Sequence, residues 1–167
     1  MKTSVLFLCV RNSARSIMAE YILRNLAGDR FVVFSAGSQP GGKVHPLTID
    51  ILRKKFNIDA RAARSKSWNH FLNFQFDLVF TLCRKGRETC PDWKGQSRLA
   101  HWEIIDPEVG TTEDLRELKF ITVAEEIHDR IKEICNLSDQ EITPYRTLTY
   151  KDVLQMKNPA ASSVVLG

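Results

Sequence analysis

The segment Ser4-Val-Leu-Phe-Leu-Cys-Val-Arg-Asn-Ser-Ala-Arg-Ser16 contains the pattern from which the fold can be predicted. Its first part, residues 4–8, is a short apolar run of the kind that forms a fully buried parallel strand. From residue 16 onward, apolar side chains recur at the spacing of a helix, at Met18, Ile22, Leu23 and Leu26. A buried strand that leads through a short loop into an amphipathic helix predicts an α/β fold.

The rest of the chain continues this alternation. We expect further strands over residues 30–35, 76–82 and 99–104, further helices over residues 45–56, 68–72 and 113–136, and a polar loop over residues 83–98. Together they predict a three-layer α/β sandwich with a central four-stranded, mainly parallel sheet and helices on both faces. Ligands are then expected at the carboxyl ends of the strands.

The length of 167 residues suits one domain, because a chain of this size can bury roughly 70% of its unfolded surface. We assign residues 1–137 to that domain. Residues 138–167 are weakly patterned and are expected to form a C-terminal extension packed on or trailing the same domain, with a short helix over residues 150–156.

Composition and charge limit the kinds of partner that this protein is expected to bind. The net charge is only +4, and the lysines and arginines are scattered among acidic residues rather than gathered into one basic block, so no nucleic-acid partner is expected. The apolar run at residues 5–10 is too short to span a membrane, so we expect no membrane partner and a cytoplasmic protein. In that compartment four cysteines are more often reactive, metal-binding or buried than joined in structural disulfides.

The loop between the first strand and the first helix places a cysteine and an arginine at the spacing Cys9-x5-Arg15. Backbone N–H groups at a helix start can converge on one point, and a guanidinium can close the ring around a tetrahedral oxyanion. The same field lowers a cysteine pKa from ~8.5 to ~3.5–7.5, which would make Cys9 a nucleophile. The residues expected to bind the oxyanion are Val10, Arg11, Asn12, Ser13, Ala14, Arg15 and Ser16.

The alternative interpretation is that Cys9 simply ends a buried strand and Arg15 is a solvated helix residue. The position of the loop, directly after a buried strand and before a helix, favours the anion site. Within it, Ser16 is placed to donate a hydrogen bond to the Cys9 sulfur, Asn12 to brace the loop, and Arg11 to add positive potential at the rim.

The loop and several later motifs resemble the low-molecular-weight tyrosine phosphatase superfamily, which includes the thioredoxin-coupled arsenate reductases. The resemblance spans about residues 3–136 and rests on Cys9-x5-Arg15-Ser16, Met18-Ala19-Glu20, Ser35-Ala36-Gly37 and Asp106-Pro107. It implies the fold of that superfamily. It also implies that Cys9 attacks the anion, that Arg15 holds its oxygens and that Asp106 protonates the leaving oxygen.

Two further cysteines favour the reductase branch. Cys83 ends the third expected strand and Cys90 follows seven residues later; residues 80–83, 88–93 and 101–102 are similar to the arsenate reductases and not to the phosphatases. The resemblance implies a relay in which Cys9 forms a thiol-arsenate adduct, Cys83 attacks Cys9 and Cys90 then attacks Cys83. The alternatives are that Cys83 is a buried thiol at the end of a strand and that Cys90 is a metal ligand or an inert residue. A zinc site is disfavoured, because the seven-residue spacing of these cysteines is not accompanied by a second close pair of ligands.

We therefore expect an arsenate reductase with no bound cofactor and no metal. Its expected partner is an external thiol reductant, either thioredoxin or glutathione with glutaredoxin. A phosphatase acting on phosphotyrosine or aryl phosphates is the alternative, and an oxyanion sensor without turnover is a third. Glu108-Val109 stands where phosphatases tend to have tyrosines, which weakens the phosphatase reading.

Three other residues, Ala14, Lys66 and Cys135, have expected roles that concern only their immediate surroundings. Ala14 replaces a cysteine common at this position in the superfamily, so the loop holds no second thiol. Lys66 lies near the place where some reductases have an acidic residue that helps to bind potassium. Our hypothesis is that no such ion binds here and that the Lys66 ammonium substitutes for it. Cys135, on the apolar face of the last helix, is expected to pack rather than react.

Overall fold

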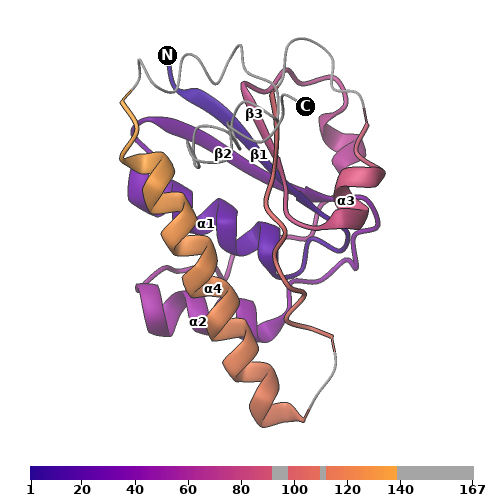
Figure 1. Ribbon diagram of the computed structural model, residues 1–167, viewed down its shortest axis with the longest axis vertical. Helices are drawn as coiled ribbons and strands as arrows, with labels where there is room; N and C mark the ends of the chain where they lie inside the picture. Colours follow the sequence, from indigo (N-terminus) through magenta and orange to yellow (C-terminus); the bar gives the residue numbers. More distant parts are fainter. Residues whose placement is uncertain (92–97, 110–111, 139–167) are drawn as a thin grey trace, which may run out of the picture.

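The computed structural model describes residues 1–91, 98–109 and 112–138, which form one central sheet and the helices that cover it (Figure 1). The strands are β1 (Thr3–Cys9), β2 (Phe31–Gly37), β3 (Leu78–Thr81) and β4 (Arg98–His101). They lie in the order β2-β1-β3-β4, and every pairing is parallel. The predicted four-stranded parallel sheet is confirmed.

β1 lies inside the sheet and is buried on both faces. Val5 and Phe7 belong to the larger hydrophobic cluster, whereas Leu6 and Leu8 belong to the smaller one on the opposite face. Successive side chains of a strand point to opposite faces, so an unbroken apolar run is what a central strand of a covered sheet needs. The same reasoning predicted this strand from the sequence.

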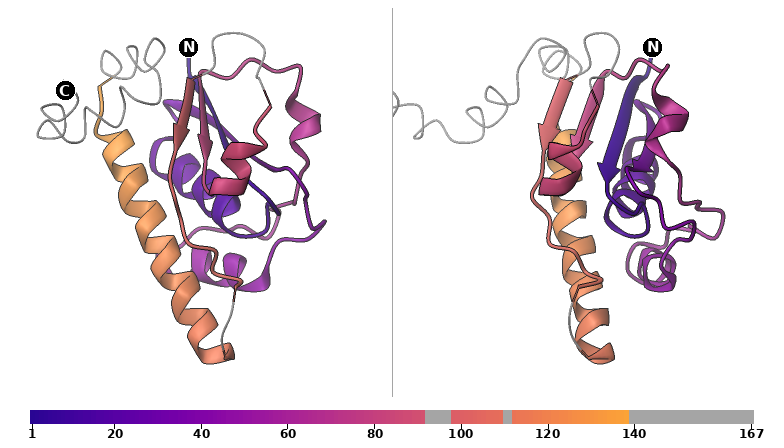
Figure 2. Two further views of the ribbon diagram at one scale, coloured as in Figure 1. Left: turned by 45° about the vertical axis from the view of Figure 1, so that its right-hand side comes forward. Right: turned by 90° about the vertical axis from the view of Figure 1, so that its right-hand side faces the viewer.

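The helices form the two outer layers. On one face α1 (Arg15–Ala27) packs between the sheet and α4 (Glu113–Cys135), and α2 (Pro46–Phe56) contacts both helices. On the other face the 3-10 helix η1 (Trp68–Phe71) contributes Phe71 to the smaller cluster. Figure 2 shows the sheet between α4 on one side and η1 on the other. The predicted three-layer sandwich is therefore confirmed.

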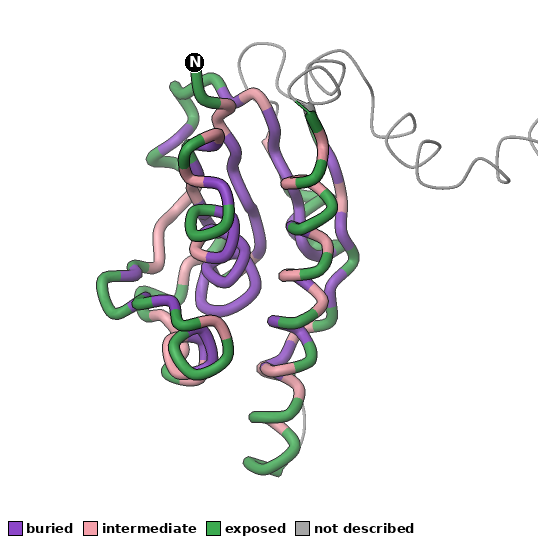
Figure 3. Tube along the Cα trace, turned by 90° about the vertical axis from the view of Figure 1, so that its left-hand side faces the viewer, coloured by how far each residue is buried: buried purple, intermediate pink, exposed green. Residues whose placement is uncertain are grey.

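α4 buries one stripe against α1 and leaves the other side to solvent (Figure 3). Of the predicted inner positions, Phe120, Val123, Ile127 and Ile131 are buried, whereas Ile134 and Cys135 near the helix end are half-buried. Within the described residues, no helix is long and apolar enough to cross a membrane.

Two local predictions were wrong. β4 ends at His101 rather than at residue 104, because its partner β3 already ends at Thr81. Residues 83–98 were expected to be a loop, but they include α3 (Arg84–Glu88). Gly86 lowers the helix propensity of this segment, so the sequence pattern did not indicate a helix. The start of the helix is capped by the Cys83 sulfur, which accepts a hydrogen bond from the Gly86 N–H at 3.3 Å. The expected helix at 150–156 and nearly all of the extension lie outside the described residues.

Gly37, at the end of β2, sets the distance between the sheet and the loop that follows β1. A Cβ added to Gly37 would lie 2.5 Å from the Val10 carbonyl oxygen and 3.0 Å from the Asn12 nitrogen. Backbone atoms cannot yield as a flexible side chain can. The residue at this position must therefore be glycine if the loop is to keep its place.

Replacing Gly37 with alanine is expected to destabilise the fold by about 1–3 kcal/mol, the usual range for overpacking. Urea unfolding measures this loss. Gly41→Ala is the matched control, since its added Cβ would approach only the Arg11 Nε, at 4.0 Å. Equal midpoints for the two variants would show that the loop tolerates displacement at Gly37.

Candidate active site

The loop of residues 10–14 joins β1 to α1 and is fixed from outside by the chain that follows β2. The N–H groups of Gln39, Gly41 and His45 donate to the carbonyl oxygens of Val10, Arg11 and Ser13 at 2.8, 3.1 and 3.0 Å. Because the C=O and the N–H of a trans peptide point in opposite directions, carbonyls held on the outside turn the following N–H groups inward. The loop is therefore shaped to present amides to an anion.

Asn12 braces the loop from within. It is fully buried and adopts a left-handed backbone conformation with φ of 49°. Its side-chain amide donates to the hydroxyl oxygens of Ser16 at 2.8 Å and Ser35 at 2.9 Å, and its Oδ1 accepts from the Lys66 N–H at 2.7 Å. Asparagine is one of the few residues besides glycine that tolerate this conformation, so both its backbone and its amide suit the position.

Cys9 ends β1 with its sulfur inside the loop. Cys9 Sγ lies 2.8 Å from Ser16 Oγ and accepts a hydrogen bond from the Asn12 N–H at 3.1 Å. Since Ser16 Oγ already accepts from the Asn12 amide, its own hydrogen is available to the sulfur. The predicted contact between Ser16 and Cys9 is thus present in the structure, and either atom could be its donor.

Arg15 begins α1 and connects the loop to the segment after β4. Its Nη1 donates to the Ile104 carbonyl at 3.1 Å and its Nη2 pairs with Asp106 Oδ2 at 2.8 Å. A small pocket is lined by Cys9, Arg11, Ser13, Ala14, Arg15, Asp106 and Glu108. Residues that lie more than ninety positions apart therefore converge at the carboxyl edge of the sheet, where the sequence placed the site.

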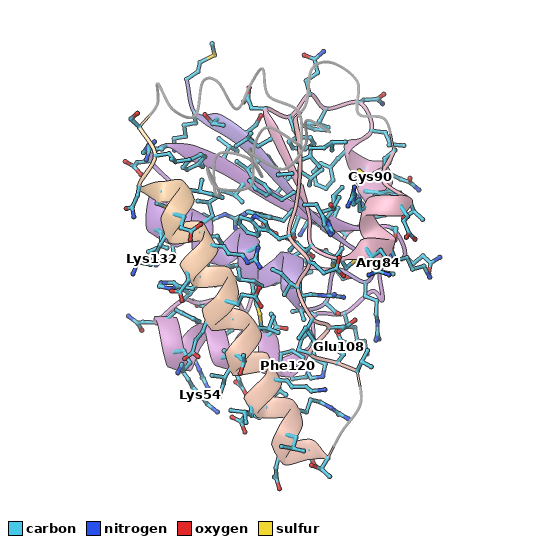
Figure 4. The ribbon with its side chains drawn as sticks, viewed as in Figure 1. Lys54, Arg84, Cys90, Glu108, Phe120 and Lys132 are labelled. Carbon is cyan, nitrogen blue, oxygen red and sulfur yellow. The ribbon has the colours of Figure 1, made fainter. Side chains whose placement is uncertain are left out.

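Glu108 lines the same pocket, although the sequence assigned it no role there. Its Oε2 pairs with Arg11 Nη1 at 2.8 Å and its Oε1 accepts a hydrogen bond from the Ser13 hydroxyl. Its place directly after Asp106-Pro107 was the one signal that could have identified it. Figure 4 labels Glu108 on the connection that leads into α4.

The pKa of Cys9 differs in direction from the sequence prediction. Burial raises the pKa of the thiol above its ordinary value of 9.0, and this outweighs the Ser16 hydrogen bond, the Arg15 charge and the backbone N–H groups of Asn12 and Ser16, all of which lower it. Arg15 also shares its charge with Asp106. The predicted lowering of the Cys9 pKa is therefore wrong in direction for this conformation.

The thiolate absorbance of Cys9 is expected to rise with pH through a midpoint above 9.0, and Ser16→Ala is expected to move that midpoint higher because a donor to the sulfur is lost. The difference in absorbance at 240 nm between the wild-type protein and Cys9→Ser isolates this group. A midpoint well below 9.0 would show that the loop amides and Arg15 outweigh burial.

Lys66 lies behind the loop and its ammonium group is held by oxygens. Nζ is 3.2 Å from Glu20 Oε2, 3.2 Å from Ser35 Oγ and 2.9 Å from the Arg64 carbonyl. Glu20 is 5% exposed, and its other partners include Arg24 and Ser35. A carboxylate, a hydroxyl and a carbonyl are ligands that a hard cation would also take. The hypothesis that this ammonium substitutes for an ion therefore gains a geometric basis.

Thermal stability and phosphate affinity of the wild-type protein are expected to be equal in potassium and in sodium salts. Lys66→Met is expected to lose about 1–3 kcal/mol in urea unfolding, because hydrogen bonds to the buried Glu20 carboxylate disappear. Lys54→Met, an exposed lysine of α2, serves as the control. A marked preference of the wild-type protein for potassium would contradict the substitution.

Cys83 and Cys90 flank α3, and all four cysteines are thiols. Cys83 is 8% exposed, and Gly86 packs against both it and the loop: a Cβ added there would lie 3.1 Å from Cys83 Sγ and 3.6 Å from Cys9 Cα. Cys90 is half-buried against the smaller cluster and lies at the end of α3 remote from Arg84 (Figure 4). Cys83 is thus beside Cys9, whereas Cys90 is separated from Cys83 by a helix.

Two other features bear on chemistry. Cys135 is half-buried, and burial raises its pKa, which fits the predicted packing role. Within residues 1–91, 98–109 and 112–138, no three His, Cys, Asp or Glu side chains gather in a way that could hold a metal ion.

Comparison with known proteins identifies one family and, among its relatives, several arsenate reductases. The family model for low molecular weight phosphotyrosine protein phosphatase matches residues 4–143. A Synechocystis protein named glutaredoxin arsenate reductase is 30% identical over 130 residues, which cover 78% of this chain and 94% of that protein. A solved structure of an arsenate reductase in the phosphate binding state has a TM-score of 0.65 and 29% identity, covering 80% of this chain and 96% of that one.

A further solved structure is that of a thioredoxin-dependent arsenate reductase from Corynebacterium glutamicum. It has a TM-score of 0.64 and 30% identity, and the match covers 80% of this chain and 60% of that one. The relatives thus differ in the reductant that their names record.

Proposed function

We propose an activity for this chain from one premise: it belongs to the low molecular weight phosphotyrosine protein phosphatase family. Within that family the chain is an arsenate reductase, which reduces arsenate to arsenite. The observation that carries this assignment is the packing of Cys83 against Cys9 through Gly86. A hydrolase needs only water after the covalent adduct forms, whereas a reductase needs a second thiol within reach of the first.

Arsenate binds in the loop of residues 10–16. Arsenate and phosphate share shape and charge, and the inward N–H groups, the Arg15 guanidinium and the start of α1 suit either anion. Arg11 adds charge at the rim, where its side chain is 58% exposed. Oxyanion binding itself therefore does not separate reductase from phosphatase.

The first step forms a bond between Cys9 Sγ and arsenic. One As–O bond breaks, and the departing oxygen takes up the thiol proton and leaves as water. A buried neutral thiol can serve here, because the substrate oxygen accepts its proton. Asp106, paired with Arg15 at the mouth of the pocket, is positioned to assist this transfer.

The second step moves the electrons. Cys83 attacks Cys9 Sγ, an S–S bond forms, the S–As bond breaks and its electron pair remains on arsenic, while the Cys83 thiol proton passes to an oxygen of the departing arsenite. Arsenic passes from the +5 to the +3 state and leaves as arsenite, while two thiols become one disulfide. Cys90 then attacks Cys83 Sγ, which releases Cys9 as a thiol and leaves a Cys83–Cys90 disulfide.

This third thiol requires α3 to open. Cys83 and Cys90 lie at opposite ends of α3, and a disulfide needs its Cα atoms within about 7 Å. α3 is short and contains Gly86, so its unwinding is inexpensive compared with that of a long helix. In this proposal α3, which was not predicted from the sequence, unwinds when Cys90 attacks Cys83.

An external thiol reductant regenerates the enzyme from the Cys83–Cys90 disulfide. A dithiol protein of the thioredoxin type attacks an internal disulfide directly, and this is the partner we favour. Glutathione with glutaredoxin is the alternative, and relatives named for each system exist. No bound cofactor is part of the scheme, and a cytoplasmic location stays a prediction from the sequence.

A phosphatase acting on aryl phosphates is the second candidate, since Cys9, Arg15 and Asp106 line one pocket. Hydrolysis would use Asp106 as the acid and would not need Cys83. An oxyanion sensor without turnover would need neither group.

Cys83→Ser is expected to abolish arsenate reduction, with a loss above a hundredfold, and to leave phosphate binding and any aryl phosphatase activity unchanged. The assay follows NADPH oxidation that depends on arsenate, with the thioredoxin and glutaredoxin systems supplied separately. Cys135→Ser is the matched control and retains activity. If Cys83→Ser kept full turnover, the relay would be wrong and Cys9 alone would have to suffice with an external thiol.

A further inference from the structure

The mouth of the anion pocket already holds a negatively charged side chain. The Glu108 side chain is only 11% exposed, and its two carboxylate oxygens are bound separately, one by Arg11 and the other by Ser13. Arg11 and Ser13 both belong to the loop that presents its donors to an oxyanion. A carboxylate thus occupies donors of the kind that a bound oxyanion needs.

The space left beside Glu108 is too small for the substrate. The pocket measures about 10 Å³, which is close to the minimum that one water molecule requires. A tetrahedral oxyanion with four oxygens is several times larger than water. Phosphate or arsenate can therefore enter only if side chains that line the pocket move, and Glu108 is one of these side chains.

The position of Glu108 is fixed by its neighbours. Its backbone N–H donates to Asp106 Oδ1 at 3.0 Å, while Asp106 Oδ2 pairs with Arg15 at 2.8 Å. The carbonyl of Val109, the next residue, accepts from Lys119 of α4 at 2.8 Å. In the free protein both arginines of the pocket therefore face carboxylates carried by one short segment.

We propose that Glu108 is a specificity-determining residue, which occupies the oxyanion site of the free enzyme and, with Arg11, forms a charged bridge across its mouth that favours inorganic oxyanions over phosphate esters. An inorganic oxyanion lies wholly within the loop, so Glu108 can return to Arg11 after it binds. The organic group of an ester must leave through the mouth and keeps the bridge open. The lost Ser13 contact therefore counts against both kinds of ligand, whereas the lost Arg11 pair counts against esters alone.

This inference rests on the proposed reductase function, because it explains how a pocket shared with phosphatases selects arsenate. It also adds a selection that the cysteines do not provide. Cys83 and Cys90 act after the adduct forms, whereas Glu108 acts on entry.

The test replaces Glu108 with glutamine, which keeps the shape and removes the charge. Inorganic phosphate is expected to bind E108Q about tenfold more tightly than the wild-type protein, since the competing anion is gone and ~1.4 kcal/mol corresponds to tenfold. Isothermal titration calorimetry measures this affinity without any turnover. E108A is a second variant with the same expected direction, and E103Q is the matched control on the same connection, with a carboxylate that is 62% exposed and pairs with His101.

The selectivity is measured as the ratio of kcat/KM for arsenate to kcat/KM for p-nitrophenyl phosphate. In E108Q kcat/KM is expected to rise for both substrates, and about tenfold more for the ester, so that this ratio falls about tenfold; E103Q is expected to keep the wild-type ratio. Unchanged or weaker phosphate binding in both Glu108 variants would overturn the occupancy of the site. Tighter phosphate binding with an unchanged ratio would overturn the role in specificity.

Failure of the relay would be distinguishable from failure of this inference. Phosphate affinity depends on neither Cys83 nor a reductant, so the calorimetric result stands whatever Cys83→Ser shows. An active Cys83→Ser enzyme would remove the reductase relay and leave the occupancy of the site by Glu108 intact.

Discussion

The buried amide of Asn12 is the interaction on which the site depends. It joins the anion loop to α1 through Ser16, to β2 through Ser35 and to the segment after α2 through the Lys66 backbone. A buried amide left without partners would cost several kcal/mol, so these contacts hold the three segments in one arrangement. The left-handed backbone of Asn12 then gives the loop its curl.

The electrostatics of the free site do not favour the thiolate form of Cys9 that the sequence predicted. Burial raises the pKa of Cys9, and the two arginines nearest to it are each paired with a carboxylate. The positive charges of Arg11 and Arg15 are therefore balanced by carboxylates of the protein itself. In the mechanism that we propose, substrate displaces Glu108 and a substrate oxygen takes the thiol proton.

Different parts of the chain were predictable to different degrees. The central strand, the first helix and α4 followed from hydrophobic periodicity, because burial on a sheet face or a helix stripe leaves a regular pattern in the sequence. α3 was missed, since five residues that include Gly86 carry no such pattern and the helix is capped by a cysteine sulfur. The Cys9 pKa was also misjudged, because the extent of burial depends on residues distant in the sequence.

The sequence alone was enough to identify the candidate reactive groups: a cysteine and an arginine at the spacing of an anion loop, after a buried strand and before a helix, together with the further cysteines that our proposal uses as the source of electrons. These are local patterns, and local backbone geometry is enough to give them meaning. The packing of Gly86 against both Cys83 and Cys9, and the contacts of Glu108 with Arg11 and Ser13 across the pocket, became visible in the folded chain alone. Those contacts join residues brought together by the parallel sheet, and no spacing along the chain encodes them.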